Sequence, residues 1–452
     1  MKRNFTKPLS AAACLGIFCL GVAACTGAAA NQAEAAGKAA QINTETQAGP
    51  GVQLSAGNAG TDANSANASG SADSGTGANS ANTSGSTSSA DLKLFQKLDF
   101  SKNTIYSPYS FADAMHLVYP AAGGTTKAEL ENALGFNADT TAAFDAYDKS
   151  MSLDKDGYGL SIANRAFLNQ NKAGLVNTSV IPNAMVQQIP MNSEGQSAID
   201  RFVNEQTRGM IPTMDCGLDE SQVMVLMNAL YFNRLWADSS YSGYDKDTQK
   251  LVWTDGTART AFGGSAALTD IKEVNSNIDA IRIPYKKSAD TEHQFSLIAI
   301  CDSDSVSGTH VYDYVRQLTP EAFDRLVDFS NNSAIPYDEA DFVLPEFTIE
   351  NTHILTDAAR SLGLGTALSG GADFAKLGPV YISEILQKAK IEVTKEGTKA
   401  AAATGLIMKT TSLIENEPTV KHVSADSYFV YVLRDETAGR NLFIGSVANP
   451  QK

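Results

Sequence analysis

The side chains that most often carry enzyme chemistry occur in this chain without a catalytic or metal-binding arrangement. The five histidines lie far apart, and none belongs to an HExxH motif or follows a pair of cysteines. There is no GxSxG nucleophile motif, no P-loop and no dinucleotide-binding fingerprint after a strand. The 50 acidic residues outnumber the 35 basic ones, and no pair of carboxylates stands out among them. The sequence therefore predicts no enzyme, no metal site and no cofactor.

One segment near the C-terminus has a pattern that suits two conformations. Residues 396–417 are EGTKAAAATGLIMKTTSLIENE, and the alanine run by itself favours a short surface helix. Taken two residues at a time, as side chains alternate along a strand, the same segment predicts a strand in which Lys399 and Lys409 lie on one face. Such a segment suits both an exposed loop and a strand with one buried side. The uncharged face, which we expect to be buried in the strand, consists of Thr398, Ala400, Ala402, Thr404, Leu406 and Met408.

The elements that must position this segment are strands and helices in irregular order. Helices are predicted at 92–98, at 111–119 with Ser110 as N-cap, and at 127–136 with Thr125 or Thr126 as N-cap and Glu129 in a capping box. Because no βαβ alternation is present, an α+β fold with mixed sheets is predicted. Runs rich in β-branched and aromatic residues predict strands at 160–170, 223–236, 280–285, 295–302, 340–350, 388–394, 427–435 and 441–448.

Composition divides the 452 residues into three parts. Residues 1–24 have a basic head and an uncharged apolar run, which is typical of an export signal and too short for a comfortable membrane-spanning helix. Residues 25–90 are mainly Ala, Ser, Gly, Asn and Thr and predict a disordered spacer. The folded domain is expected at 91–452, which is long enough to bury a large core. The formal net charge of −15 argues against nucleic acid as a partner.

The end of the apolar run, Val22-Ala23-Ala24-Cys25, resembles the lipobox of bacterial lipoproteins. The resemblance implies cleavage before Cys25 and a diacylglycerol on its thiol, which would anchor the exported protein to a membrane. The expected location is the cell surface, with later release from the cell as the alternative. An ordinary signal peptide with an incidental cysteine is the alternative. The processed chain would have 32 basic and 50 acidic residues, a net charge of −18. Its remaining cysteines, Cys216 and Cys301, are expected to be buried free thiols, although one disulfide is possible.

Motifs around the two-conformation segment follow the order in which they occur in serpins, a family of peptidase inhibitors. The stretch from Lys395 to Thr404 resembles the hinge of the serpin reactive-centre loop. The resemblance covers about residues 90–452. The other similar stretches are NTIYSPYS at 103–110, GGTTKAELENALG at 123–135, NALYFNRLW at 228–236, LPEF at 344–347, LGLG at 362–365, DF at 373–374, FIG at 443–445 and NP at 449–450.

This resemblance implies the serpin fold, with a large central mixed β-sheet, further sheets, surrounding helices and an exposed reactive-centre loop. It implies a monomeric suicide substrate of serine-type peptidases, with cysteine-type ones also open. The peptidase would cleave the loop, form an acyl-enzyme and be trapped as the loop inserts into the sheet. The resemblance assigns Glu396, Gly397, Thr398, Ala400, Ala401, Ala402, Ala403 and Thr404 to the hinge, and Ser107, Pro108, Ser110, Asn228 and Trp236 to the shutter and breach.

The position of the cleaved bond follows from counting along the hinge in the family manner. With Gly397 as the fifteenth residue before the cut, the bond is Thr411–Ser412, and Lys409 and Thr410 are alternatives. Cleavage after Lys409 implies a trypsin-like target, whereas cleavage after Thr411 implies an elastase-like or subtilisin-like one. Counting back from Tyr428 gives a later bond, because the loop beyond Ser412 is longer than in many serpins.

Three residues depart from the family pattern. Lys395 and Lys399 stand where serpins usually have glutamate, and Gln387 replaces a common histidine. None of the three places a charge on the uncharged face, so an inhibitor remains the main hypothesis. A non-inhibitory serpin that acts in surface binding or adhesion is the second hypothesis, and a solute-binding or hydrolytic lipoprotein is the third.

Overall fold

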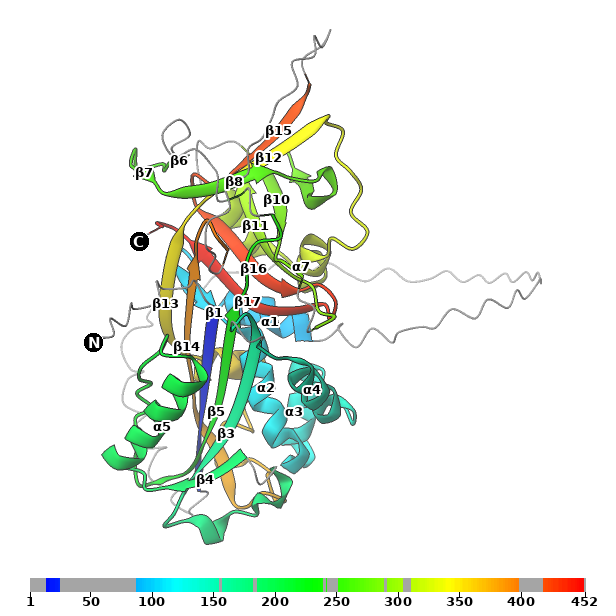
Figure 1. The fold of residues 1–452 in the computed structure, drawn as a ribbon. Helices are drawn as coiled ribbons and strands as arrows, with labels where there is room; N and C mark the ends of the chain where they lie inside the picture. Colours follow the sequence, from blue (N-terminus) through cyan, green and yellow to red (C-terminus); the bar gives the residue numbers. More distant parts are fainter. Residues whose placement is uncertain are drawn as a thin grey trace, which may run out of the picture. The chain divides into compact units, whose positions relative to one another are not determined.

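The computed structural model describes residues 14–24, 87–153, 157–181, 185–238, 241, 251–287, 291–303, 310–397 and 418–450. Within them, a six-stranded sheet, which we call sheet A, has the strand order β13-β14-β1-β5-β3-β4. Neighbouring strands are antiparallel except β3 and β4, which are parallel, so the sheet is mixed as predicted. The strands are β1 (Cys14–Ala24), β3 (Gly159–Asn169), β4 (Val186–Ile189), β5 (Gln222–Asn233), β13 (Phe347–Ile354) and β14 (Val380–Val393) (Figure 1).

A second sheet of six strands and two small sheets complete the β-structure. The second sheet has the order β2-β17-β16-β11-β10-β9, and the small ones are β15-β12-β8 and β6-β7. Figure 1 shows β12, β15 and β8 beyond one end of sheet A. The bounds are β2 (Thr104–Tyr106), β6 (Leu251–Val252), β7 (Ala258–Arg259), β8 (Ala261–Ser265), β9 (Ile271–Asn275), β10 (Ile278–Pro284), β11 (Phe295–Asp302), β12 (Glu339–Pro345), β15 (Val420–Ser424), β16 (Phe429–Asp435) and β17 (Arg440–Val447).

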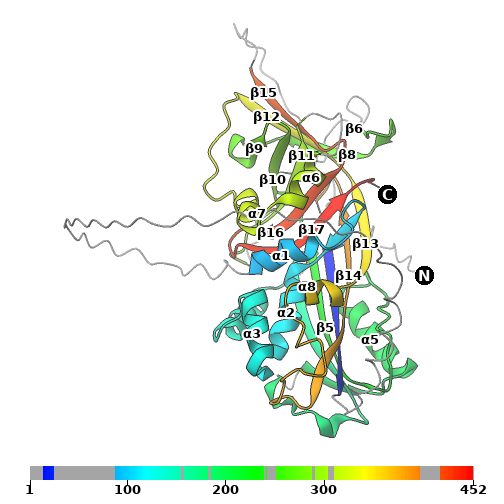
Figure 2. The same cartoon turned by 180° about the vertical axis from the view of Figure 1, so that it is seen from behind.

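Helices cover both faces of sheet A, which explains why every residue of β5 is buried. Alternate residues of β5 pack in two separate apolar clusters, one of which includes α5 (Ser193–Gln206). On the other face lies α2 (Pro108–Val118), all of whose residues are buried (Figure 2). The remaining helices of the described part are α1 (Thr87–Phe95), α3 (Gly124–Leu134), α4 (Thr140–Ser150), α6 (His310–Gln317), α7 (Pro320–Val327) and α8 (Thr356–Ser361).

Local details differ from the sequence predictions at helix starts. The N-cap of α2 is Ser107, whose hydroxyl accepts from the Ser110 amide, so Ser110 is not the cap. The N-cap of α3 is Gly123, without a side-chain cap. The Glu129 carboxylate accepts from Thr366 N and Ala367 N instead of closing a capping box, because a loop distant in sequence packs beside the helix. Local patterns do not contain that tertiary contact.

Boundaries of strands also differ. The strand predicted at 340–350 is two strands, β12 and β13, that belong to different sheets and are separated by Glu346. The strand predicted at 388–394 is the end of the longer β14. Helix α1 begins at Thr87, inside the stretch assigned to the spacer. Cys216 and Cys301 are free and buried, which confirms the expectation of free thiols.

Candidate functional site at the opening of sheet A

The centre of sheet A holds an unexpected strand. Residues 14–24, the apolar run of the predicted export signal, form β1 between β5 and β14. The strand is antiparallel to both neighbours, with paired residues from Leu15 to Ala24 against β14 and from Cys14 to Ala23 against β5. The position between β5 and β14 therefore accepts a whole antiparallel strand of 11 residues. No helix in the described part of the chain is long and apolar enough to cross a bilayer.

The chain leaves β14 at the mouth of this position. Gly397 forms β-bridges with Thr394, just after β14, and with Leu235, just after β5. Its φ of 88° lies in the left-handed region, and a Cβ there would stand 2.3 Å from Trp236 N. Only glycine fits both constraints. The predicted hinge residues Glu396 and Gly397 thus lie where a strand entering between β5 and β14 would begin.

Trp236, predicted in the breach, supports the same turn. Its ring stacks on Tyr285 and Phe262, with centroid separations of 4.5 and 5.3 Å, and is 3% exposed. The indole Nε1 donates to Thr394 O at 3.0 Å. A buried indole needs such an acceptor, so the ring fixes the end of β14.

The residue that departs from the family pattern at the hinge is held by its backbone. Lys395 N donates to Glu346 Oε1 at 2.8 Å. No ion pair of the Lys395 side chain occurs among the described residues. The loop base is therefore anchored to β12 and β13 through a main-chain amide.

The predicted shutter residues meet under sheet A. Ser107 Oγ donates to Leu442 O at 2.8 Å and lies 3.0 Å from Ser110 Oγ. Gln387 of β14 is fully buried; its Oε1 accepts from Ser107 N and its Nε2 donates to Ser107 O, each at 2.8 Å. The glutamine that replaces the family's common histidine therefore ties β14 to the start of α2. Pro108 is the first residue of that helix.

Asn228, the remaining shutter residue, faces a buried acid on α2, Asp113, that is not among the predicted site residues. Its Nδ2 donates to Asp113 Oδ2 on α2 and, at 3.0 Å, to Asn164 Oδ1 on β3. Asn164 Nδ2 also donates to Asp113 Oδ2 at 3.1 Å. Asp113 and His116, three residues apart on an otherwise uncharged helix, were the available sequence signal, because buried charged groups need partners.

The rest of the predicted site lies outside the described residues. This holds for Thr398, for the alanine hinge, for the uncharged face through Met408, and for the proposed bond Thr411–Ser412 with its alternatives. Cys25 also lies outside them. Those assignments stay predictions.

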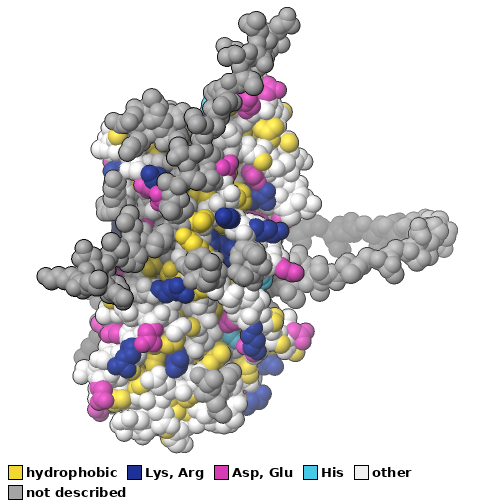
Figure 3. Space-filling model, in the orientation of Figure 1, with side chains coloured by type: hydrophobic (Ala, Val, Ile, Leu, Met, Phe, Trp, Pro, Cys, Tyr) yellow, Lys and Arg dark blue, Asp and Glu magenta, His cyan; other side chains and the backbone are white. Residues whose placement is uncertain are grey.

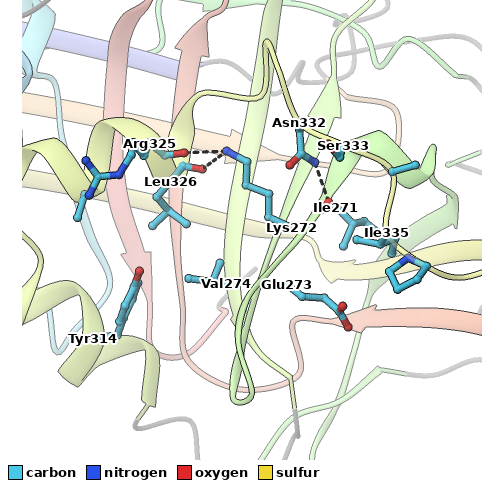
Figure 4. Close-up of a pocket in the computed structure, with 13 residues that line it drawn as sticks. Ile271, Lys272, Glu273, Val274, Tyr314, Arg325, Leu326, Asn332, Ser333 and Ile335 are labelled. Carbon is cyan, nitrogen blue, oxygen red and sulfur yellow. Dashed lines mark hydrogen bonds between the residues drawn. The ribbon is translucent and has the colours of Figure 1, made fainter.

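Other features of the described residues do not form a second site. A shallow pocket of about 530 Å³ lies between β9, α7 and residues 332–336 (Figure 4). Its lysine, Lys272, already donates to three backbone carbonyls, those of Arg325, Leu326 and Asp328. No cluster of three potential metal ligands occurs among the described residues. Where side chains are described on the face in Figure 3, acidic and basic groups are interspersed.

Comparison with known proteins decides the family. The family model "Serpin (serine protease inhibitor)" matches residues 86–450. This chain is a serpin. Serpins are protease inhibitors and not catalytic enzymes, which agrees with the absence of catalytic motifs from the sequence.

The matches to curated relatives of this serpin cover nearly the whole length of those relatives. Leukocyte elastase inhibitor A of Mus musculus is 26% identical over 388 residues, 79% of this chain and 97% of the relative. Serpin-Z7 of Hordeum vulgare is 29% identical over 388 residues, 77% of this chain and 90% of the relative. Among solved structures, native tengpin, a thermophilic serpin, superposes with a TM-score of 0.62 at 23% identity, over 80% of this chain and 93% of the other. The likeness in structure confirms the predicted fold.

Proposed function

We propose that this serpin inhibits a serine-type peptidase as a suicide substrate, through cleavage of its loop and insertion of the hinge into sheet A. One observation carries the proposal: an antiparallel strand fits between β5 and β14, and the chain leaves β14 at the mouth of that position. The segment 398–408, which carries the uncharged face, has the same number of residues as β1, 11.

The chemistry would come from the target. Its serine would attack the carbonyl of Thr411, release the amine of Ser412 and leave the peptidase esterified to Thr411. The freed hinge would then pair with both β5 and β14, gaining a row of backbone hydrogen bonds on each side. That gain would carry the attached peptidase along the sheet before water could hydrolyse the ester. Lys409 or Thr410 would serve in the same way if the bond lies earlier.

The strand position can hold only one occupant, so β1 and the hinge exclude each other. Cleavage before Cys25 would remove all of β1, which ends at Ala24. The processed protein would then have the position free, and a diacylglycerol on Cys25 would anchor it to a membrane through the spacer. Metabolic labelling with a radioactive fatty acid should mark the wild-type protein and not Cys25→Ser, whereas equal labelling would refute the anchor.

Trapping tests the inhibitory function directly. The protein, purified after export and with its N-terminus determined by mass spectrometry, is mixed with trypsin, elastase and subtilisin. An SDS-resistant complex with at least one of them is expected, and simple cleavage by all of them would contradict the proposal. Sequencing the released C-terminal peptide fixes the cleaved bond.

A matched pair of hinge variants tests the direction of insertion. Thr398→Glu places a charge on the face that becomes buried, which costs several kcal/mol and should convert the inhibitor to a substrate. Lys399→Glu places the same charge on the other face and should still trap the peptidase. Equal trapping by the two variants would refute the assignment of the faces.

A non-inhibitory role in surface binding or adhesion is the second candidate. The lysines at 395 and 399, where serpins usually have glutamate, favour it. It predicts loop cleavage without trapping and without a large rise in thermal stability after the cut.

A further inference from the structure

Helix α2 is tied to sheet A at two points on opposite sides of the strand position. Ser107, at its start, holds Gln387 of β14 by two hydrogen bonds. Asp113, further along, holds Asn228 of β5 and Asn164 of β3. Between these two points α2 packs against β1, the strand in the centre. The helix therefore bridges the opening from one side to the other.

The spacing of the two ties matches the width of the open sheet. Six residues separate Ser107 from Asp113, which is about 9 Å along a helix at ~1.5 Å per residue. Two strand spacings of ~4.8 Å, from β14 across a central strand to β5, amount to about 9.6 Å. If β5 moved one spacing to pair with β14, Asn228 would leave the reach of Asp113, since a hydrogen bond tolerates only a few tenths of an ångström.

We propose that Asp113 is a positioning residue that holds β5 one strand away from β14, and that its hold depends on the protons of His116 and Asp148. The proposal rests on the function proposed above, because it concerns the step in which a strand enters sheet A. It is argued from the two ties and from the network of buried polar groups around Asp113.

That network joins α2, α4 and the sheet. His116 Nδ1 lies 2.9 Å from Asp113 Oδ1, and its ring stacks on Phe144 of α4 at 4.8 Å. Asp148 of α4 accepts from Tyr109 at 2.5 Å and from Asn164 at 3.2 Å. Three other titratable or charged groups face the network. Asp145 lies 3.7 Å from His116 Nε2, and Tyr147 donates to Asp435, which also contacts His293. The Arg440 guanidinium lies over the rings of Tyr109, Phe144 and Tyr147.

Protons change the charge of this network near neutral pH. Burial, together with the negative charge of Asp113, raises the pKa of Asp148 to about 7. Burial lowers the pKa of His116, but the Asp113 and Asp148 carboxylates outweigh it and raise that pKa overall. Below both pKa values Asp148 is neutral and His116 carries a positive charge beside Asp113. Above them His116 is neutral and Asp148 carries a negative charge under the sheet.

The sign of the effect is the same for both groups. A carboxyl with a raised pKa contributes stability at low pH that is lost as the pH rises through about 7. A histidine with a raised pKa contributes stability below its ordinary value that is lost as the pH rises through its value in the fold. The hold on β5 should therefore weaken as the pH rises from about 6 to about 8.5.

Hydrogen exchange of the full chain, in which β1 fills the position, tests the proposal without any peptidase. Amide protection is measured at about pH 6 and about pH 8.5, corrected for the intrinsic rate. We expect protection in β1 and β5 to fall about tenfold or more at the higher pH, while β10 and β11 of the other sheet keep theirs. In Asp148→Asn and in His116→Gln, which cannot make the same charge change, most of this fall should disappear.

Asp139→Asn is the matched control, because Asp139 is exposed just before α4 and carries the same charge. It should behave as the wild type. An equal loss of protection in both sheets, or an unchanged pH dependence in Asp148→Asn, would overturn the proposal. Because the readout needs no trapping, its failure is distinct from failure of the inhibitory function, which the complex with peptidase reports.

Discussion

Replacement of Gly397 by alanine tests the geometry at the mouth of sheet A. Left-handed backbone costs a residue with a Cβ about 1–2 kcal/mol relative to glycine. The new Cβ would also stand 2.3 Å from Trp236 N and 2.8 Å from Leu235 C, so the chain must move. The movement would break the bridge to Leu235 and the bond from Gly397 N to Thr394 O. At about 1 kcal/mol for each hydrogen bond, Gly397→Ala should lose about 3–4 kcal/mol in total.

Urea denaturation of the full chain measures this loss as a change in the free energy of unfolding, provided that the slope of the transition is unchanged. Gly370→Ala is the matched control, since Gly370 has an ordinary φ and nothing within 4 Å of a built Cβ. It should stay within about 0.5 kcal/mol of the wild type. If Gly397→Ala is as stable as Gly370→Ala, the turn does not need glycine and the geometry inferred for the hinge is wrong.

Three further predictions concern the shutter, the breach and a buried acid. Gln387→Leu leaves Ser107 N without a buried partner and should lower the free energy of unfolding in urea by about 2–4 kcal/mol. Gln387→His, which can keep one hydrogen bond, should lose about half as much, and equal losses would contradict the tie by two bonds. Trp236→Phe keeps the ring stacking but loses the hydrogen bond to Thr394 O, so it should lower the free energy of unfolding by about 1 kcal/mol. Trp236→Ala should lower it by about 3–5 kcal/mol, and an equally large loss in Trp236→Phe would assign the indole N–H a larger role. Burial raises the pKa of Asp91 to about 8, so its ionisation should lower the thermal midpoint of unfolding as the pH rises through that value. Asp91→Asn should reduce the fall of the midpoint between about pH 6 and pH 9. An undiminished fall in this variant would contradict a raised pKa for Asp91.

The family followed from the sequence, because short motifs in a fixed order survive at low identity. Ser107, Asn228 and Trp236 were predicted as shutter and breach residues, and all three lie at the opening of sheet A. The sequence also predicted that the chain is not an enzyme, and membership of the serpin family supports this prediction.

The partners of the buried polar groups could not be predicted in the same way. Asp113 was visible as an acid on an apolar helix, but its partners come from β3 and β5, about 50 and 115 residues away in sequence. Gln387 was noted only as a departure from the family pattern, and its two bonds to Ser107 cross 280 residues. Hydrogen bonds of this kind depend on which elements pack together, and periodicity along one chain does not contain that information.

The sequence by itself determined the composition of the three parts and the types of most elements, because these depend on residue type and short spacing. It also predicted two conformations for residues 396–417. The tertiary structure decided where the segment begins and what could receive it. Gly397 lies at the mouth of a position one strand wide, and α2 spans that position with a tie on each side. The reason is physical: a strand can enter the interior of a sheet only between two strands that are held apart, and that separation is set by contacts distant in sequence.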